Sequence, residues 1–187
     1  MYLIVGLGNP GKEYELSRHN LGFRVIDSIS KDLGIDVSKF NSGALIGQGD
    51  LDGTRIMLAK PQTFMNLSGI CVRDLMNWYK IEKNKLIVIN DDLDLDPGRI
   101  KIMDGGNSAG HKGVESVIAG LGTTRFARIR VGIGRESLGG DNSGYVLQKP
   151  DTEQMEAVDS SIIKAADAAK AIITKGIEAA RNLYNGT

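Results

Sequence analysis

The chain of 187 residues contains two histidines, His19 and His111. An imidazole changes its charge between about pH 5 and 8, which suits histidine to proton transfer near neutral pH. Any histidine-based general acid or base must therefore be one of these two. His19 lies in the polar stretch Tyr-Glu-Leu-Ser-Arg-His-Asn rather than on an apolar stripe. A surface or helix-capping histidine is the alternative interpretation.

A short apolar run is followed by four aspartates, Asp91, Asp92, Asp94 and Asp96. Clustered carboxylates suit hard cations, but this spacing lacks the glycine and the distal glutamate of an EF-hand loop. A strand that runs into a solvated acidic loop is the common alternative. Because α/β enzymes place functional groups at the carboxyl ends of strands, Asp91 is the candidate functional carboxylate.

Residues 6–11, Gly-Leu-Gly-Asn-Pro-Gly, match the dinucleotide-binding fingerprint literally. That fingerprint needs a helix N-terminus for the pyrophosphate directly after the turn. Pro10 disfavours helical geometry at Asn9, and no acidic residue ends a second strand about 20 residues on, where the ribose contact belongs. We favour a plain strand-to-loop turn, and we infer no cofactor.

Residues 106–110, Gly-Asn-Ser-Ala-Gly, match the nucleophile elbow of α/β-hydrolases. Such enzymes place an acid and then a histidine after the serine, whereas the histidine that follows Ser108 is His111, three residues on. His111 cannot both activate Ser108 and be oriented by an acid. We favour a glycine-rich loop that is structural or shaped to approach a ligand.

Alternating strands and helices must position these residues. The apolar run at residues 2–7 predicts a buried strand, and helical spacing predicts a helix over residues 17–33 that stops at Gly34. Two β-rich stretches within residues 43–60 flank Asp52-Gly53, a pair that favours a type I′ hairpin turn.

The alternation continues in the rest of the chain. One apolar helix face is marked by Leu67, Ile70, Cys71, Leu75 and Trp78. Further strands are predicted at residues 85–89, 99–103 and 126–133, a short helix at 111–121, and one long alanine-rich helix from Thr152 to near Tyr184. The pattern predicts an α/β fold, a single domain over residues 1–187 with a mixed β-sheet flanked by helices on both faces.

Charge and cysteine content narrow the function. Basic and acidic residues number 23 each, so RNA binding would need a local patch rather than an overall basic field. The single cysteine, Cys71, excludes an internal disulfide framework, and its apolar helix face predicts a buried hydrophobe rather than a nucleophile. We find neither a signal peptide nor an apolar run near the roughly 18 residues of a membrane span. We expect a cytoplasmic protein.

Several short motifs follow one another in a specific order. They are Gly-Leu-Gly-Asn-Pro-Gly at 6–11, Tyr14, Arg18-His19-Asn20, Thr-Phe-Met-Asn-Leu-Ser-Gly at 63–69, Asp-Asp-Leu-Asp-Leu at 91–95, Gly110-His111, and residues 128–134 and 144–147. Together they resemble the bacterial peptidyl-tRNA hydrolase family, and the resemblance covers nearly the whole chain. Each motif alone is weak, whereas the ordered set is highly specific.

The resemblance implies an esterase that cuts the bond between a peptide, or an N-blocked amino acid, and the 3′ end of tRNA. It implies that His19 is the base that takes a proton from the attacking water and that Asp91 orients His19. Asn9 and Asn66 are implied to position the peptide and polarise the carbonyl, and Asn9 to help reject tRNA that carries a free amine. An ester is already an activated carbonyl compound, so we expect no metal, cofactor or covalent intermediate.

The same resemblance suggests how tRNA is held. The cleft for its single-stranded 3′ end is expected to be lined by Tyr14, Phe64, Met65 and His111. The candidates for a phosphate-binding patch are Lys101, Arg128 and Arg130. The chain departs from the family's commonest pattern at Lys112, where an asparagine usually stands, and at Asn107-Ser108. A cation at residue 112 could hold phosphate in place of an amide contact.

Two other functions stay open. An RNA-binding relative could keep this fold without catalysis, although the four catalytic candidates are all present. A nucleotide-dependent oxidoreductase would rest on residues 6–11 alone and would bind NADP(H) with micromolar affinity. We infer no obligatory protein partner and expect a monomer.

Overall fold

The structure, a computed structural model, describes residues 1–135 and 142–186. Within them lies one seven-stranded sheet with the strand order β2-β3-β4-β1-β5-β7-β6. The strands are β1 (Tyr2–Gly6), β2 (Lys39–Asn41), β3 (Ala44–Leu51), β4 (Thr54–Pro61), β5 (Leu86–Asp92), β6 (Ile100–Asp104) and β7 (Ala127–Gly132). Strands β4, β1, β5 and β7 are parallel, whereas β2, β3 and β6 pair antiparallel with their neighbours. The carboxyl ends of the parallel strands therefore meet at one edge.

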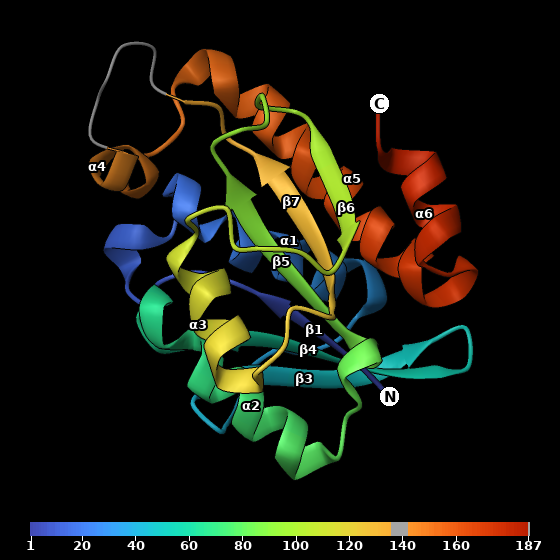
Figure 1. Ribbon diagram of the computed structural model, residues 1–187. Coiled ribbons are helices and arrows are strands. Elements are labelled where there is room, and N and C mark those ends of the chain that lie inside the picture. The colour runs from blue at the N-terminus through green and yellow to red at the C-terminus, as the bar shows by residue number, and fades with distance from the viewer. Residues whose placement is uncertain (136–141, 187) are drawn as a thin grey trace.

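Helices cover both faces of this sheet (Figure 1). The α-helices are α1 (Leu21–Leu33), α2 (Ser68–Tyr79), α3 (Lys112–Leu121), α4 (Asn142–Leu147), α5 (Thr152–Lys175) and α6 (Ile177–Tyr184), and the 3-10 turns are η1 (Lys12–Tyr14), η2 (Arg18–Asn20), η3 (Met65–Leu67) and η4 (Lys83–Lys85). Ile4 packs in a core with α1, α5 and α6, whereas Leu3 and Val5 pack in a second core with α2 and α3. The prediction of a mixed sheet flanked by helices on both faces is confirmed.

Several local predictions are also confirmed. Helix α1 ends at Gly34, which is left-handed with φ 64°. Strands β3 and β4 form a hairpin whose turn residues Asp52 and Gly53 have φ values of 50° and 80°, as a type I′ turn requires. Cys71 is buried, and burial, with a smaller effect of Asp74, raises the pKa of its thiol to about 12. It is therefore a thiol rather than a thiolate nucleophile at neutral pH.

Two predicted helix bounds are wrong. The helix expected from residue 17 begins at Leu21, because Arg18–Asn20 form the 3-10 turn η2. The single C-terminal helix is two helices, since Gly176 (φ 87°) leaves helical geometry between α5 and α6. None of the helices in the described ranges has the length and apolar character needed to cross a bilayer.

The apolar face predicted for α2 is wrong for part of its length. The buried residues of this helix include Cys71, Val72, Leu75 and Met76, whereas Leu67, Ile70 and Trp78 are exposed, Trp78 by 72%. The reason is a close crossing with α3, where a Cβ on Gly69 would lie 1.8 Å from the carbonyl oxygen of Ser116. This crossing, rather than helical periodicity alone, decides which side of α2 is covered.

Helix α1 lies directly against the backbone of β1. A Cβ on Gly6 would be 2.1 Å from the carbonyl oxygen of Gly22, and a Cβ on Gly22 would be 2.4 Å from the backbone nitrogen of Leu7. Only glycine permits this approach at both positions. The contact brings the start of α1, and the η2 turn that precedes it, to the carboxyl end of β1.

Candidate active site

A cavity of about 560 Å³ lies at the edge where β1 and β5 end. Its walls come from the segments that follow these two strands, from η2, η3 and α4, and from the start of α3. The predicted site residues among its lining are Asn9, His19, Phe64, Met65, Asn66, Asp91, His111 and Lys112. The fold thus gathers most of the predicted site from distant parts of the chain.

His19 and Asp91 form a hydrogen-bonded pair in this cavity. Nδ1 of His19 lies 2.9 Å from both carboxylate oxygens of Asp91, which is buried at the end of β5. An ionised carboxylate only accepts hydrogen bonds, so Nδ1 carries the hydrogen. Nε2 of His19 is then the basic nitrogen, and no hydrogen bond to any described residue occupies it.

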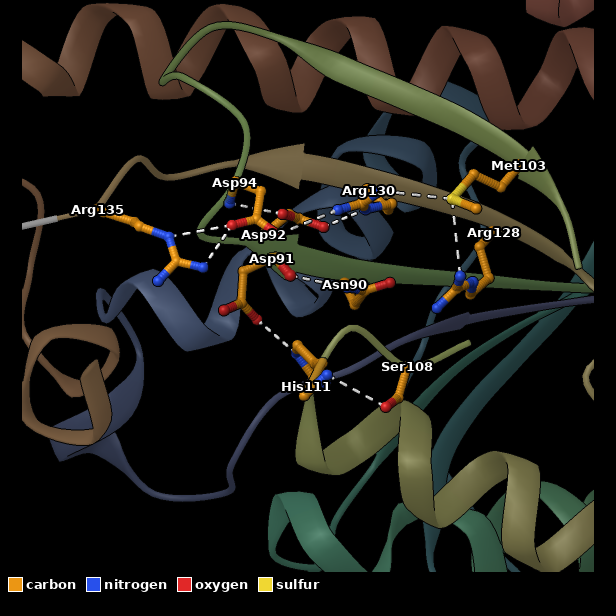
Figure 2. Close-up of polar contacts among 11 residues, drawn as sticks. Asn90, Asp91, Asp92, Asp94, Met103, Ser108, His111, Arg128, Arg130 and Arg135 are labelled. Carbon is orange, nitrogen blue, oxygen red and sulfur yellow. Dashed lines mark hydrogen bonds and ion pairs between the residues drawn. The ribbon is translucent and has the colours of Figure 1, made fainter. Parts of the chain in front are cut away.

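His111 is a second donor to Asp91. Its Nε2 lies 2.9 Å from Oδ1 of Asp91, as Figure 2 shows. Its Nδ1 accepts hydrogen bonds from the backbone nitrogens of Gly113 (3.1 Å) and Val114 (3.2 Å) at the start of α3. Nδ1 therefore carries no hydrogen, and Nε2 donates to the carboxylate. With both nitrogens occupied, His111 cannot activate Ser108, which agrees with a glycine-rich loop rather than a nucleophile elbow.

Burial and charge oppose each other at the His19–Asp91 pair. Burial alone lowers the pKa of His19, but the charge of Asp91 and its hydrogen bond together raise that pKa above its usual value. Burial also raises the pKa of Asp91, yet the two imidazoles hold the pKa of this carboxyl well below its usual range. Asp91 is therefore ionised and stabilises the protonated form of His19.

Asn9 presents its amide nitrogen to the cavity because its amide oxygen is already used. Oδ1 accepts a hydrogen bond of 2.8 Å from the backbone nitrogen of Met65. The side chain of Asn20 fixes the backbone of Asn9, accepting from its nitrogen at 2.8 Å and donating to its oxygen at 2.9 Å. Asn20 adjoins His19 in η2, so one turn positions both the imidazole and the Asn9 donor.

The segment after β1 does not form a nucleotide site. Residues 6–11 lead into η1, a 3-10 turn of three residues, instead of the N-terminus of an α-helix. The pyrophosphate site that the dinucleotide fingerprint requires is therefore missing from this segment. Tyr14, at the end of η1, is half-buried and is not among the residues that line the cavity.

The η3 turn supplies another wall. Phe64 and Asn66 are exposed and Met65 is buried, and all three line the cavity. Lys112 is exposed at the start of α3, where its Nζ lies 3.6 Å from Oε2 of Glu115. These side chains lie where a ligand can contact them.

The predicted phosphate patch is wrong for Arg128. This arginine is 2% exposed, and its Nη2 lies 3.7 Å from the sulfur of Met103. A Cβ on Gly106 would lie 3.3 Å from the same Nη2, so the glycine-rich loop after β6 covers the face on which we expected exposed arginines. Lys101, on the neighbouring strand, is exposed.

Arg130 is also engaged within the protein. It forms an ion pair with the buried Asp92, and its Nη1 lies 3.6 Å from the sulfur of Met103 (Figure 2). A phosphate contact of Arg130 would therefore have to compete with Asp92. None of Lys101, Arg128 and Arg130 lines the cavity.

The four aspartates do not converge on one point. Asp92 pairs with Arg130, while Asp94 lies 2.6 Å from Nη2 of Arg135 (Figure 2). Within the described ranges, one group of histidine, cysteine and acidic residues is close enough to hold a metal ion, namely His19, Asp91 and His111, with ligand atoms within 4.8 Å. A cation there would have to displace both imidazole N–H groups from the carboxylate.

Known proteins resemble this chain over nearly its whole length. A family model described as peptidyl-tRNA hydrolase matches residues 3–187. The chain belongs to the peptidyl-tRNA hydrolase family. Peptidyl-tRNA hydrolase from Thermoanaerobacter sp. (strain X514) is 48% identical over 186 residues, with 100% of both chains covered. The one from Geobacillus kaustophilus (strain HTA426) is 46% identical over 185 residues, covering 99% of this chain and 100% of that protein.

Solved structures of the peptidyl-tRNA hydrolase family share the whole fold. The crystal structure of peptidyl-tRNA hydrolase from Acinetobacter baumannii matches with a TM-score of 0.93 at 32% identity, covering 100% of this chain and 95% of that one. Uridine phosphorylase from Vibrio fischeri, at 12% identity and a TM-score of 0.57, shows similarity of fold alone. The resemblance predicted from the ordered motifs is confirmed.

Sequence reasoning missed two parts of this candidate site. One is the donation from His111 to Asp91. The other is α4, which contributes Asn142, Ser143, Val146 and Leu147 to the cavity. A helix of six residues is too short to produce a periodic signal. The motif at residues 144–147 marked this segment without indicating its structure.

Proposed function

We propose that His19 is the general base of a peptidyl-tRNA hydrolase, in which water splits the ester between a peptide and the 3′ ribose of tRNA. Family membership supplies the reaction and the substrate. The observation that carries the residue roles is the contact of His19 Nδ1 with Asp91, 2.9 Å from each carboxylate oxygen. It leaves Nε2 of His19 for a water molecule in the cavity.

The proposed reaction needs two proton transfers at this nitrogen. Nε2 takes a proton from water while the water oxygen attacks the ester carbonyl. The ring becomes an imidazolium, whose charge the buried Asp91 stabilises. When the tetrahedral intermediate collapses, the imidazolium returns the proton to the departing ribose oxygen. The products are a peptide with a free carboxyl group and tRNA with a free 3′-hydroxyl.

Two amides are proposed to recognise the acyl part. Asn9 has its Oδ1 engaged with Met65, so its Nδ2 can donate to a carbonyl oxygen of the peptide. A free α-amine offers no such oxygen, which favours peptidyl-tRNA and N-blocked aminoacyl-tRNA over unblocked aminoacyl-tRNA. Asn66 is proposed to donate to the ester oxygen, where one donor aimed at a developing oxyanion contributes about 3 kcal/mol.

The tRNA contacts are proposed from the cavity wall and from residues outside it. Phe64 is 60% exposed and can stack on an unpaired base of the 3′ end, a contact of about 1–3 kcal/mol. Met65 lies beside it, and the exposed Lys112 and Lys101 are proposed phosphate contacts. His111 acts through Asp91, and Tyr14 is proposed to contact tRNA from outside the cavity. Because the substrate comes from translation, we place the reaction in the cytoplasm. We propose that the enzyme needs no obligatory protein partner.

The decisive experiment compares wild type with His19→Ala on N-acetylated aminoacyl-tRNA, beside the unblocked form. Multiple turnover on the blocked substrate is expected, with a loss of about 10²–10⁴-fold in the variant and little change in tRNA affinity. Lys175→Ala, exposed at the end of α5, is the control. Wild-type turnover by the variant would remove His19 from this role, whereas a folded wild type that binds tRNA without cutting it would indicate a non-catalytic relative.

A further inference from the structure

Arg18, the residue before His19, lies 4% exposed beneath the segment that follows α4. Its Nη1 donates to the carbonyl oxygen of Lys149 at 2.8 Å, and its Nη2 donates to Oε1 of Gln154 at 2.8 Å. Its backbone nitrogen donates to the carbonyl oxygen of Gln148 at 2.9 Å. One buried arginine thus joins η2 to two residues between α4 and α5 and to one in the first turn of α5.

The same guanidinium also holds α4 itself. Its central carbon lies 4.0 Å from the ring centroid of Tyr145, and Nη1 lies 3.5 Å from the carbonyl oxygen of this tyrosine. Tyr145 is the buried residue of α4, and its hydroxyl donates to the carbonyl oxygen of Ile133 at 2.9 Å. Tyr145 is the one buried residue of α4, and Val146 packs partly buried against the core, so the contact between Arg18 and Tyr145 lies at the point where α4 is anchored.

The charge of Arg18 is balanced without a carboxylate. Among the described residues it forms no ion pair, and the groups that meet it are carbonyl oxygens, an amide oxygen and an aromatic face. A planar guanidinium serves these several partners at once, which the single ammonium group of lysine cannot do. The arrangement is therefore specific for arginine.

Helix α4 matters because it is a wall of the active-site cavity. Four of its six residues line that cavity, as does His19, the next residue after Arg18. The interactions that orient His19, its hydrogen bonds to Asp91, do not involve α4. Loss of the arginine would free the wall while leaving the base and its carboxylate in place.

We propose that Arg18 is a positioning residue that holds α4 as a wall of the substrate cavity and thereby sets the affinity for peptidyl-tRNA. The inference rests on the proposed function of this cavity. The proposal gives two adjacent residues of η2 different roles. His19 carries out the proton transfers, and Arg18 shapes the space in which the substrate is bound.

The test uses Arg18→Met, which keeps the aliphatic stem, and Arg18→Lys, which keeps the charge. For both, KM should rise about tenfold with kcat changed less than about threefold, since an interaction lost equally from bound substrate and transition state raises KM alone. The acid limb of the pH profile should stay in place. Amide hydrogen exchange should accelerate in residues 142–149 and stay unchanged in β5. The matched control is Arg24→Met, which loses an arginine contact to α5 at Asp159 without touching α4.

A purely structural role would give a different pattern. A lower melting temperature with unchanged KM and unchanged exchange in residues 142–149 would overturn the proposal. If Arg18→Met does not fold, Gln154→Ala removes one of the same contacts and should raise KM to a smaller extent, and an unchanged KM there would also overturn it. An inactive wild type would contradict the proposed function. The exchange measurement would still show whether Arg18 holds α4 in place.

Discussion

The carboxylate of Asp91 determines the electrostatics of the cavity, because it is buried and accepts hydrogen bonds from two imidazoles. Its charge opposes the effect of burial on His19, and the pKa of His19 ends above its usual value. A base with a raised pKa is a stronger proton acceptor. It is also protonated, and therefore inactive, up to a higher pH.

The first prediction concerns Asp91→Asn. Removing the carboxylate charge leaves burial as the main effect on His19, so the pKa of His19 should fall below its usual value of about 6.5. Activity is lost as pH falls through the pKa of the base, so the acid limb of kcat/KM should move to lower pH. The plateau should drop by about 10²-fold or more, because the imidazolium loses its partner. An acid limb in the wild-type position would contradict this electrostatic account.

The second prediction is that a change at His111 moves the acid limb of kcat/KM in the opposite direction. His111→Ser removes the Nε2 donor to Asp91, so the carboxylate charge acts more strongly on His19 and raises its pKa further. The acid limb should therefore move to higher pH. Serine is a good N-cap, so it can replace His111 at the start of α3, and thermal denaturation checks that the helix is kept. Shifts of equal sign in the two variants would be inconsistent with this role.

Residue types along the chain reduced the candidates for proton transfer to a few residues, and the family resemblance then pointed to His19 and Asp91. There were two histidines to choose from, and Asp91 follows an apolar run. The amide orientation of Asn9 could not be predicted, because it depends on a hydrogen bond to Met65, 56 residues away. The hydrogen bond from His111 to Asp91 could not be predicted for a similar reason. Backbone contacts at the start of α3 fix which nitrogen of His111 carries the hydrogen.

Close backbone contacts position the site at the scale of elements. Gly22 lies in the second position of α1, directly after the η2 turn that carries His19. An added Cβ would approach Leu7 N and Leu7 O to 2.4 Å and Ile89 O to 2.6 Å. These atoms belong to the backbone that follows β1 and to β5, so no side chain can move aside.

The third prediction is that Gly22→Ala destabilises the protein and displaces His19. Overpacking costs about 1–3 kcal/mol, and a clash with backbone atoms places this substitution near the upper end. Urea denaturation should show the lower stability, and kcat should fall because η2 moves with α1. Lys31→Ala, exposed on the same helix, should change stability by less than about 0.5 kcal/mol. Equal effects of the two substitutions would show that the close approach is not needed.

Elements with a strong local signal were predicted well, and those set by distant contacts were not. The hairpin at Asp52-Gly53 and the end of α1 at Gly34 depend on local backbone geometry. The exposed side of α2 depends on its crossing with α3 at Gly69. Likewise, the break at Gly176 interrupts a continuous apolar pattern, so periodicity alone predicted one helix where there are two.

The balance of charge shapes substrate binding at the scale of the whole molecule. With 23 basic and 23 acidic residues, the chain has no net charge, so a few local cations must contact the tRNA phosphates. The sequence suggested alternating arginines on one strand, but β7 lies between β5 and β6, and the loop after β6 covers Arg128. A strand pattern does not tell which face a distant loop will cover.

The fourth prediction separates an exposed cation from a buried one on this face of the sheet. Lys101→Met should weaken tRNA binding most at low salt and reduce the slope of log K against log salt by about 1, as expected for one lost phosphate contact. Arg128→Met should leave that slope unchanged. Burial lowers the pKa of Arg128, and the nearby Arg130 lowers it further, against a smaller opposing effect of Asp92. A neutral side chain of similar length should therefore not reduce the melting temperature. A reduced slope for Arg128→Met would mean that the loop over it opens when tRNA binds and exposes the arginine to phosphate.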